Sequence, residues 1–502
     1  MNAAVPVLDP AAFLAAAAAL LGPRGLTSDA DLLAPWLTEW RGRYTGRALA
    51  LASPASTAEV AALVRLCAQY RVPIVPQGGN SGMCGGATPD ASGAALLLSL
   101  RRMDAVRSLD PEARRVTCEA GVILENLHHA AEGAGLRFPL TLGGKGSATI
   151  GGLISTNAGG TQVLRHGSMR ALVLGIEAVL ADGSVYSALT PLKKDNRGFD
   201  LKQLLIGSEG TLGIVTAATL ALVPAVAERV AVWCAVPSLQ VARRLLLHCA
   251  DALGTALEGF EVLPAASLEA VLDYLPGART PLAGEHTWHV LLEAVADSAS
   301  AATLRERVEM AIAGAFEAGL VADAAFSSSE AQAEAFWTLR DSIAPAERAK
   351  GPAVQHDISV PVERMPDFVD HASAEIEAAF PGVEAIAFGH LGDGNVHFHA
   401  IAPADTADGV HWQETIGKTI SAKVNDMVVE WGGSLSAEHG IGQLKLAELE
   451  RLGDPVALGM MRAVKAALDP LGLLNPGKLV RPGELAGAAP TAGALAPQTP
   501  SA

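Results

Sequence analysis

Apolar and polar positions in the first half of the chain follow helical spacing and strand spacing in turn. Residues 57–71 carry apolar side chains at helical spacing, and Thr57 is the predicted N-cap. The run VPIVPQGGNSG at 72–82 predicts a short strand that ends in a glycine turn. The alternation of predicted helices and strands continues to about Pro224.

Beyond this point the pattern changes to longer apolar strands separated by alanine-rich helices. Strands are expected at 230–237, 286–295 and 385–402, and helices at 238–253 and 300–319. A last helical segment is expected from about 411 to 469. The chain is therefore predicted to be α+β, with an antiparallel sheet in its second half.

The change of pattern predicts three parts of the chain. Residues 1–224 and 225–480 are expected to form two domains, because 502 residues exceed the size of one ordinary domain. Residues 481–502 are rich in Ala, Pro, Gly and Thr without periodicity, which predicts a disordered tail.

Charge and composition narrow the class of protein. Half of the residues are hydrophobic and 18% are charged, which is typical of a globular protein. A net charge of −16 disfavours nucleic acid and anionic lipid as partners. The five cysteines have irregular spacing and no CxxC, so neither a disulfide framework nor a cysteine zinc site is expected.

The first residues do not have the pattern of a targeting signal. The apolar run that follows Asp9 and Pro10 is short and has no basic residues before it, which favours a capped surface helix over a signal peptide. No stretch approaches the roughly 20 apolar residues of a membrane span. We therefore expect a cytoplasmic protein without a transmembrane segment.

Three dense glycine clusters lie in the first half, at 78–86, 143–160 and 207–213. Clustered glycines are favoured where the backbone turns sharply or approaches a ligand closely. Consecutive N–H groups in the first cluster could bind a pyrophosphate. The cluster is neither a Walker A loop nor a GxGxxG turn, so a nucleotide would be bound in another way.

The histidines of the second half suggest a metal site. The run from His390 to His397 predicts a strand, a tight Gly-Asp-Gly-Asn turn and a second strand, which would bring the two imidazoles together. Glu438 and His439 follow about forty residues later. Two imidazoles and a carboxylate suit Zn²⁺ with open positions, and Fe²⁺ or Mn²⁺ fits by ligand type.

Several motifs together resemble a known family. PQGGNSG, GGLISTNAGG, LGIEAVLADG, KDNRGFDLKQLLIGSEGTLGIVT and the terminal NPGK are similar to the FAD-linked D-2-hydroxyacid dehydrogenases, a branch of the vanillyl-alcohol-oxidase type flavoproteins that includes D-2-hydroxyglutarate and D-lactate dehydrogenases. The resemblance covers roughly residues 40 to 480. It implies a two-lobed PCMH-type FAD-binding domain followed by a cap domain over the flavin.

The resemblance also assigns cofactor residues. It implies that the following residues bind FAD: Pro76, Gln77, Gly78, Gly79, Asn80, Ser81, Gly143, Gly152, Ser155, Asn157, Gly160, Glu209, Gly210 and Ile214. Some relatives attach FAD through a histidine in the first glycine loop, and none lies between Pro76 and Gly86 here. Non-covalent FAD is therefore expected. Cys84 in the same loop is the less favoured alternative, as a point of covalent attachment.

For the reaction centre, the resemblance implies that His390, His397 and Glu438 hold a divalent metal, Zn²⁺ being the first choice. His439 would be the base that takes the hydroxyl proton, and Arg340 would bind the C1 carboxylate by a bidentate fork. The hydride of C2 would pass to flavin N5.

Three positions depart from the family pattern. Members that oxidise D-2-hydroxyglutarate have a threonine and a lysine, four and fifteen positions after the arginine, that help to hold the distal carboxylate. Ala344 and Gln355 stand at those positions, and His399 replaces an expected asparagine. Gln355 and His399 remain substrate-binding candidates. The substrate is thus expected to be D-lactate-like or D-2-hydroxyglutarate-like.

Other functions stay open. A flavin oxidase that uses O₂, an aldonolactone or cytokinin substrate, a flavin subunit of a glycolate-oxidase-like complex, and a metal-free site were each considered. The paired HxGDGNxH and EHG motifs argue against an aldonolactone or cytokinin substrate. The intact Glu438-His439 pair and Arg340 argue against a subunit without catalytic activity. The electron acceptor could be a quinone, a cytochrome or an electron-transfer flavoprotein, and a homodimer is the default oligomer.

Overall fold

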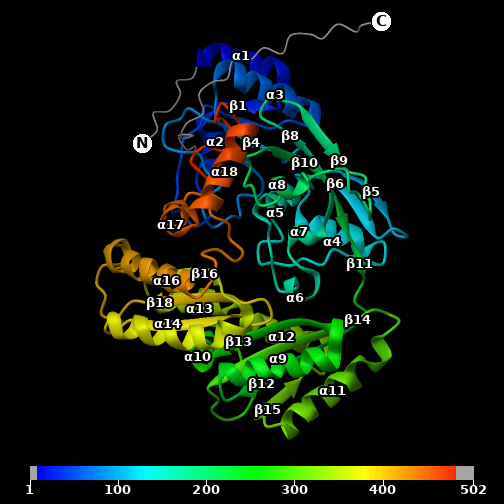
Figure 1. The fold of residues 1–502 in the computed structure, drawn as a ribbon, viewed down its shortest axis with the longest axis vertical. Helices are drawn as coiled ribbons and strands as arrows, with labels where there is room; N and C mark the ends of the chain where they lie inside the picture. Colours follow the sequence, from blue (N-terminus) through cyan, green and yellow to red (C-terminus); the bar gives the residue numbers. More distant parts are fainter. Residues whose placement is uncertain (1–7, 482–502) are drawn as a thin grey trace, which may run out of the picture.

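The computed structural model describes residues 8–481, which form an N-terminal domain and a cap domain that lies below it in Figure 1. Nearly all of the predicted tail lies outside the described residues. The N-terminal helix α1 (Pro10–Leu21) is capped by Asp9 as expected, because its carboxylate accepts the N–H of Ala12 at 3.0 Å. No helix in the described part of the chain is long and apolar enough to cross a membrane.

The first lobe contains a small mixed sheet. Its order is β1 (Leu26–Thr27), β2 (Ala50–Ala52), β4 (Leu96–Ser99) and β3 (Ile74–Gln77), with the last three strands parallel. Leu96 and Leu98 pack under α1 and α3 (Thr57–Tyr70), whereas Leu97 faces α2 (Ala30–Leu37). Burial on both faces explains the continuous apolar run of β4.

One predicted cap was misplaced by one residue. The Oγ of Ser56 accepts the N–H of Glu59 at 3.2 Å, so Ser56 caps α3 and Thr57 is its first helical residue. Ser56 adopts the extended backbone of an N-cap. Thr57 instead donates its hydroxyl to Glu177 at 2.7 Å.

The second lobe is an antiparallel sheet of five strands. Its order is β5 (Val106–Asp110), β6 (Arg115–Glu119), β10 (Ile214–Ala221), β8 (Val173–Val179) and β9 (Val185–Ala188). Helix α5 (Ile150–Thr156) contacts β10, and a Cβ at Gly151 would lie 2.7 Å from the Cβ of Ala120, which follows β6. Together the two lobes give the α+β architecture that the sequence predicts.

The cap is built on a seven-stranded antiparallel sheet (Figure 1). Its order is β15 (Asp323–Phe326), β12 (Glu228–Val236), β14 (Trp288–Ala296), β13 (Leu257–Pro264), β17 (Glu384–His390), β18 (Asn395–Ile401) and β16 (Ala353–Ser359). Successive residues of β12 alternate between two cores, since Val232 joins one and Trp233 the other. The antiparallel sheet expected beyond residue 224 is therefore present.

Helices cover both faces of this sheet. One face packs under α9 (Leu239–Leu253), α11 (Ala301–Glu317), α14 (Met365–Ala379) and α16 (Lys418–Glu430). The other packs under α10 (Ala265–Tyr274), α12 (Glu330–Asp341) and α13 (Ile343–Lys350). Phe388 belongs to this second face and contacts His397 and His399, so the histidines lie on the α12–α13 side.

The predicted helical segment at 411–469 is interrupted. Helix α16 ends at Glu430, and α17 (Leu446–Leu452) begins only after a loop at 431–445. Gly432, Gly440 and Gly442 in this loop have positive φ, a conformation that glycine adopts without strain. This loop, hereafter the Glu438–His439 loop, carries the second half of the expected site.

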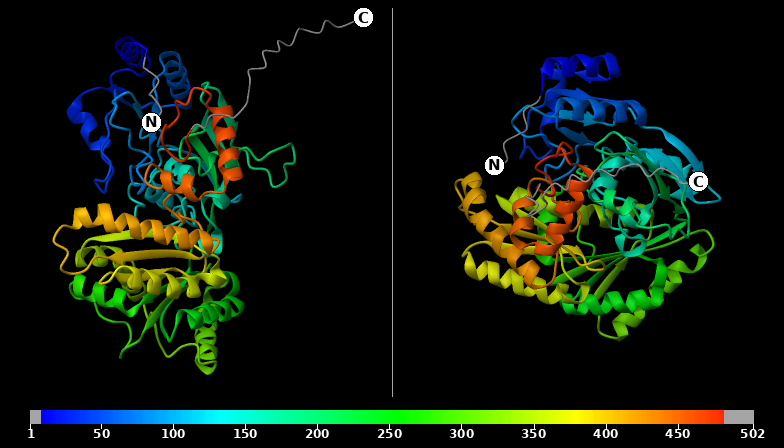
Figure 2. Two further views of the ribbon diagram at one scale, coloured as in Figure 1. Left: turned by 60° about the vertical axis from the view of Figure 1, so that its left-hand side comes forward. Right: turned by 45° about the horizontal axis from the view of Figure 1, so that its top comes forward.

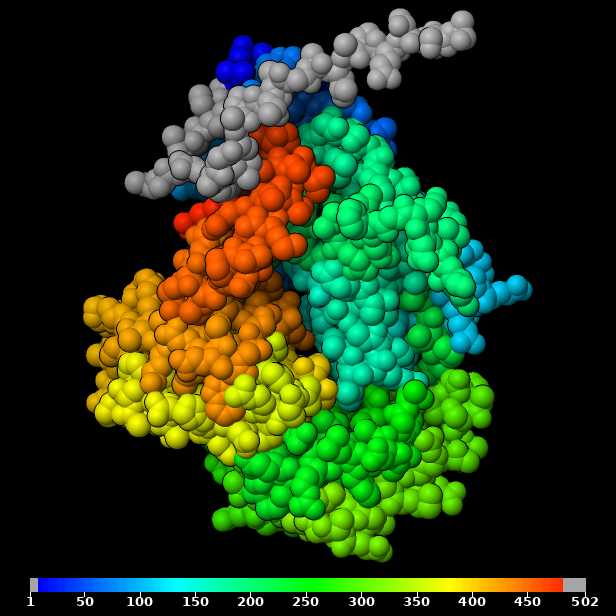
Figure 3. Space-filling model, in the orientation of Figure 1, coloured from blue at the N-terminus to red at the C-terminus, as the bar shows by residue number. Residues whose placement is uncertain are grey.

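After this loop the chain returns to the N-terminal domain, where α17 and α18 (Pro455–Leu468) lie above the cap (Figures 2 and 3). Leu474 forms a parallel β-bridge with Ile74, the first residue of β3. The Nζ of Lys465 donates to the carbonyl of Thr211 at 2.7 Å. The C-terminal residues of the expected second domain thus become part of the first domain's packing.

A buried carboxylate ties the two domains together. Glu258 of β13 is 2% exposed and pairs with Arg137 of β7 (Leu136–Arg137) at 2.5 Å and with Arg165 of α6 (Val163–His166) at 2.8 Å. Burial alone would raise the pKa of Glu258, but hydrogen bonds and charges from Arg137 and its neighbours lower it to about 2.

Replacing Glu258→Gln should therefore weaken domain docking. Removing one partner of a buried ion pair costs about 3 kcal/mol or more, so we expect a lower Tm at pH 7 by calorimetry. The carboxylate's contribution is present above about pH 4.5 and is lost as pH falls toward 2, since its folded pKa is depressed. The control Glu330→Gln removes an exposed carboxylate, 70% accessible, and should change Tm little.

Candidate active site

A glycine-lined cavity lies between the two lobes of the N-terminal domain. Eleven of the fourteen predicted cofactor residues line it: Pro76, Gln77, Gly78, Gly79, Asn80, Ser81, Gly152, Ser155, Glu209, Gly210 and Ile214. The backbone N–H groups of Gly79 to Gly82 donate to no other group in the described part of the chain. Four free donors along a glycine turn fit an anionic pyrophosphate.

Close packing explains the glycines of this cavity. A Cβ at Gly79 would lie 1.7 Å from the carbonyl oxygen of Ser147, and one at Gly78 would lie 2.3 Å from Thr149 Oγ1. Asn80 has φ 52° and anchors the turn by donating its Nδ2 to Thr38 at 2.9 Å. The turn is thus held rigidly with its N–H groups free.

The other three predicted cofactor residues lie elsewhere. Gly143 and Gly160 line a larger cavity of about 990 Å³ beneath the cap. Asn157 lines neither cavity. Its Oδ1 instead accepts hydrogen bonds from Ser168 Oγ at 3.0 Å and from the N–H of Arg170 at 2.9 Å. Its side chain fixes the end of α5.

Cys84 also borders the smaller cavity. Burial raises the pKa of its thiol to about 11, and its Sγ donates to the carbonyl of Gly440 at 3.3 Å. A thiol in this state is a poor nucleophile, which supports the expectation of a cofactor that is not attached at Cys84.

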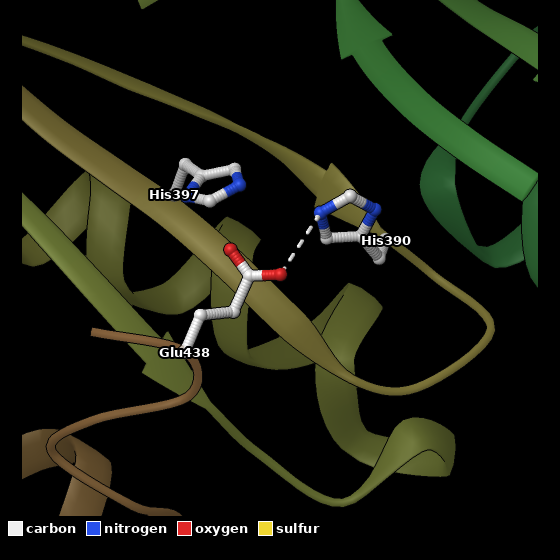
Figure 4. Close-up of side chains that lie close together, drawn as sticks. All are labelled: His390, His397 and Glu438. Carbon is white, nitrogen blue, oxygen red and sulfur yellow. Dashed lines mark ion pairs between the residues drawn. The ribbon is translucent and has the colours of Figure 1, made fainter. Parts of the chain in front are cut away.

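Three predicted metal ligands converge in the larger cavity. His390 ends β17, His397 lies on β18, and Glu438 reaches them from its loop (Figure 4). Their ligand atoms lie within 4.8 Å of one another, and His390 Nε2 is 3.9 Å from Glu438 Oε1. The hairpin turn therefore brings the histidines together as its sequence predicts.

A buried carboxylate orients this cluster. Glu261 of β13 is 1% exposed, and its Oε1 lies 2.6 Å from His390 Nδ1. This contact turns Nε2 of the same ring toward Glu438. Metal-binding histidines commonly have such a carboxylate behind them, so the arrangement fits a divalent ion.

The pKa shifts of these side chains also favour a bound cation. Burial raises the pKa of Glu438 to about 7 and lowers the pKa of His397 well below its ordinary value. The positive charges of His390 and Arg340 lower the pKa of Glu438 but do not offset its burial, so its ionised form remains costly. A divalent cation between these side chains would remove that cost.

His439 lies where the two cavities meet, and within residues 8–481 it alone lines both. Asp357 of β16 accepts the backbone N–H groups of Glu438 and His439, each at 2.9 Å, and its Oδ2 lies 3.4 Å from His439 Nδ1. Burial lowers the pKa of His439 to about 4, although Asp357 opposes the shift. A neutral imidazole can accept a proton.

Arg340 of α12 lies in the same cavity. Its guanidinium donates to Glu261 Oε2 from Nε at 2.9 Å, and Nη2 is 3.3 Å from His390 Nε2. Glu261 therefore orients both the arginine and the histidine. A substrate carboxylate placed beside the metal ligands would be within reach of this guanidinium.

Ala344, Gln355 and His399, the three positions that depart from the family pattern, also line the larger cavity. The Nε2 of Gln355 is buried and has no hydrogen-bond partner among residues 8–481. His399 Nδ1 contacts the carboxylate of Glu347, which is fully buried and also accepts from Ser267 Oγ at 2.9 Å. Gln355 thus lines the cavity, while its amide nitrogen is buried without a partner in the described part of the chain.

Sequence reasoning missed the residues that act behind the site. Glu261, Asp357 and Glu347 are buried acids that position arginine, histidine or backbone groups. An acid within an apolar strand, as in EGFEVLP or AVQHDIS, was the available signal. No local pattern indicates which partner such an acid will meet.

The fold and the paired cavities define a flavin-linked oxidoreductase with a substrate cavity under a cap. The family described as FAD binding domain matches residues 48–188, and the family described as FAD linked oxidases, C-terminal domain, matches residues 226–479. p-Cresol methylhydroxylase has a similar fold with a TM-score of 0.72 at 15% identity, over 94% of this chain and 98% of that chain.

Sequence relatives identify the branch. The chain is 37% identical to D-2-hydroxyglutarate dehydrogenase of Xanthomonas citri pv. viticola, over 88% of this chain and 91% of the relative. It is 36% identical to the mitochondrial D-2-hydroxyglutarate dehydrogenase of Bos taurus, over 91% and 81%. The chain belongs to the FAD-linked D-2-hydroxyacid dehydrogenase family, whose members are FAD-dependent oxidoreductases that act on the CH–OH group.

Replacing Gly79→Ala should impair flavin binding. The added Cβ would displace the Ser147 backbone, so we expect a lower ratio of flavin absorbance to protein in the purified variant. The control Gly459→Ala adds a methyl group into open space on α18 and should keep its flavin. Full flavin content in Gly79→Ala would contradict the role given to this turn.

Replacing His397→Ala or Glu438→Gln should remove the divalent ion. Elemental analysis of the wild-type protein should find about one divalent ion per chain, because the site offers three ligands. The control His129→Asn changes an exposed histidine on α4 (Leu124–Glu132) and should retain the ion. Unchanged metal content in both site variants would place the ion elsewhere.

Proposed function

We propose that the protein oxidises a D-2-hydroxy acid to the 2-oxo acid, with a divalent metal, a base and FAD in one reaction centre. The observation that carries this proposal is the position of His439, which lines both the glycine cavity and the metal-ligand cavity. A substrate hydroxyl between these cavities would lie close to a proton acceptor on one side and to the cofactor on the other.

Each side chain has a task that follows from its chemistry. Neutral His439 takes the hydroxyl proton, and Asp357 holds the ring in place and stabilises the imidazolium that forms. Arg340, oriented by Glu261, binds the C1 carboxylate. When bound, Zn²⁺ would acidify the 2-hydroxyl and FAD would accept the C2 hydride at N5.

The residues around the proposed metal support zinc on ligand type. His390 and His397 supply imidazole nitrogens, and Glu438 supplies an oxygen, which leaves positions for a hydroxyl and a carboxylate oxygen. The relatives named D-2-hydroxyglutarate dehydrogenase favour a substrate of that kind over D-lactate. The electron acceptor, a quinone, a cytochrome or an electron-transfer flavoprotein, stays a prediction.

Dye-linked reduction tests the activity directly. D-2-Hydroxyglutarate, D-lactate and L-lactate should be compared before and after EDTA, with Zn²⁺ added back. We expect reduction by a D-acid alone, loss with the chelator and recovery with the ion. Absence of reduction by every 2-hydroxy acid would overturn the proposed function, and activity that survives removal of all metal would overturn the metal's part in it.

Replacing His439→Gln should leave the protein folded but lower its rate of substrate oxidation. Loss of a general base typically lowers kcat by about 10²- to 10⁴-fold, and rapid anaerobic mixing would measure the rate of flavin reduction. His129→Asn serves as the control with an unchanged rate. A normal rate in His439→Gln would show that another group takes the proton.

A further inference from the structure

An arginine that the family resemblance does not assign faces the larger cavity from the N-terminal domain. Arg41 lies in the segment 38–45, which folds back on itself through a bridge between Thr38 and Thr45. Glu39 holds this segment rigid, because its carboxylate accepts the N–H groups of Arg41 at 2.7 Å and Arg43 at 2.6 Å. The backbone that carries Arg41 is therefore fixed.

The guanidinium of Arg41 has no anionic partner. It lies over the ring of Trp40 at 5.1 Å, and no carboxylate of residues 8–481 is within 4.0 Å of it. The carboxylate of Glu39 is already occupied by backbone groups. A partly buried guanidinium without a counter-ion at a cavity wall is a strong binding group for an anion.

Two further arginines surround this group. Burial and the charges of Arg43 and Arg348 lower the pKa of Arg41 to about 10, so it stays charged at neutral pH. Arg43 and Arg348 are exposed and, like Arg41, form no ion pair within residues 8–481.

Arg41 lines the same cavity as Ala344 and Gln355, which stand where the family pattern has a threonine and a lysine. Arg348 belongs to α13, the helix that also carries Ala344 at the cavity wall. Arg41 and His439 line the same cavity. Of the five arginines that line it, Arg137, Arg229, Arg305 and Arg340 form ion pairs with carboxylates, whereas Arg41 forms none within residues 8–481.

We propose that Arg41 binds the second carboxylate of a dicarboxylic D-2-hydroxy acid. A cation from the N-terminal domain would then replace the family's lysine, whose position is occupied by Gln355 in this chain. Gln355 lines the same cavity but carries no charge to pair with that carboxylate. Arg43 and Arg348 attract the dianion toward the cavity. This inference rests on the proposed function and specifies its substrate class.

Steady-state kinetics of Arg41→Gln test the inference with two substrates. A lost charge-assisted hydrogen bond corresponds to roughly a 10- to 100-fold change. We expect KM for D-2-hydroxyglutarate to rise by this factor, with little change for D-lactate. Arg41→Lys should recover part of the loss. The control Arg47→Gln removes an exposed arginine that lines neither cavity and should match the wild type.

Product binding gives a second readout that does not need turnover. The flavin spectrum of the wild-type holoenzyme should be titrated with 2-oxoglutarate and with pyruvate, and the titrations repeated with Arg41→Gln. We expect weaker binding of 2-oxoglutarate alone. Equal effects on both substrates, or no effect on either, would overturn the role of Arg41 while leaving the proposed function intact.

Failure of the proposed function has a different signature. In that case the wild-type flavin would be reduced by neither D-2-hydroxyglutarate nor D-lactate. Weaker binding of 2-oxoglutarate to Arg41→Gln would then still support an anion site at Arg41, and unchanged binding would overturn it.

Discussion

Two buried carboxylates hold the Glu438–His439 loop between the domains, and the reaction centre depends on them. Asp357 of the cap accepts the N–H groups of Glu438 and His439, whereas Glu209 of the N-terminal domain accepts those of Ile441 and Gly442, both at 2.7 Å. Four charge-assisted hydrogen bonds thus fix a loop that has no regular structure. They place the proposed base at the junction of the two cavities.

The same arrangement recurs around the proposed metal ligands. Glu261 contacts both His390 and Arg340, so one buried acid sets the geometry of a proposed metal ligand and of a proposed carboxylate-binding group. Such acids are costly to bury alone, and each is offset by a cation or by several N–H donors. The site is therefore rigid before any ligand enters, which favours correct placement of a small substrate.

Both domains line the larger cavity. Arg340 and the histidines come from the cap, whereas Arg41, Gly143 and Gly160 come from the N-terminal domain. Glu258 pairs with Arg137 and Arg165 across the interface and so holds the two domains in a fixed relative position. A change in domain docking would consequently alter substrate binding as well as stability.

The sequence by itself determined the elements and motifs whose signals are local. Apolar spacing predicted the cap strands and helices, and the Gly-Asp-Gly-Asn turn predicted that His390 and His397 converge. Tertiary structure decided the rest: the return of the C-terminal residues to β3, the placement of Glu261 and Asp357 behind the site, and the exposure of Arg41 to the cavity. These contacts join residues tens to hundreds of positions apart. No short-range pattern encodes such pairings, because they arise only when separate elements pack together.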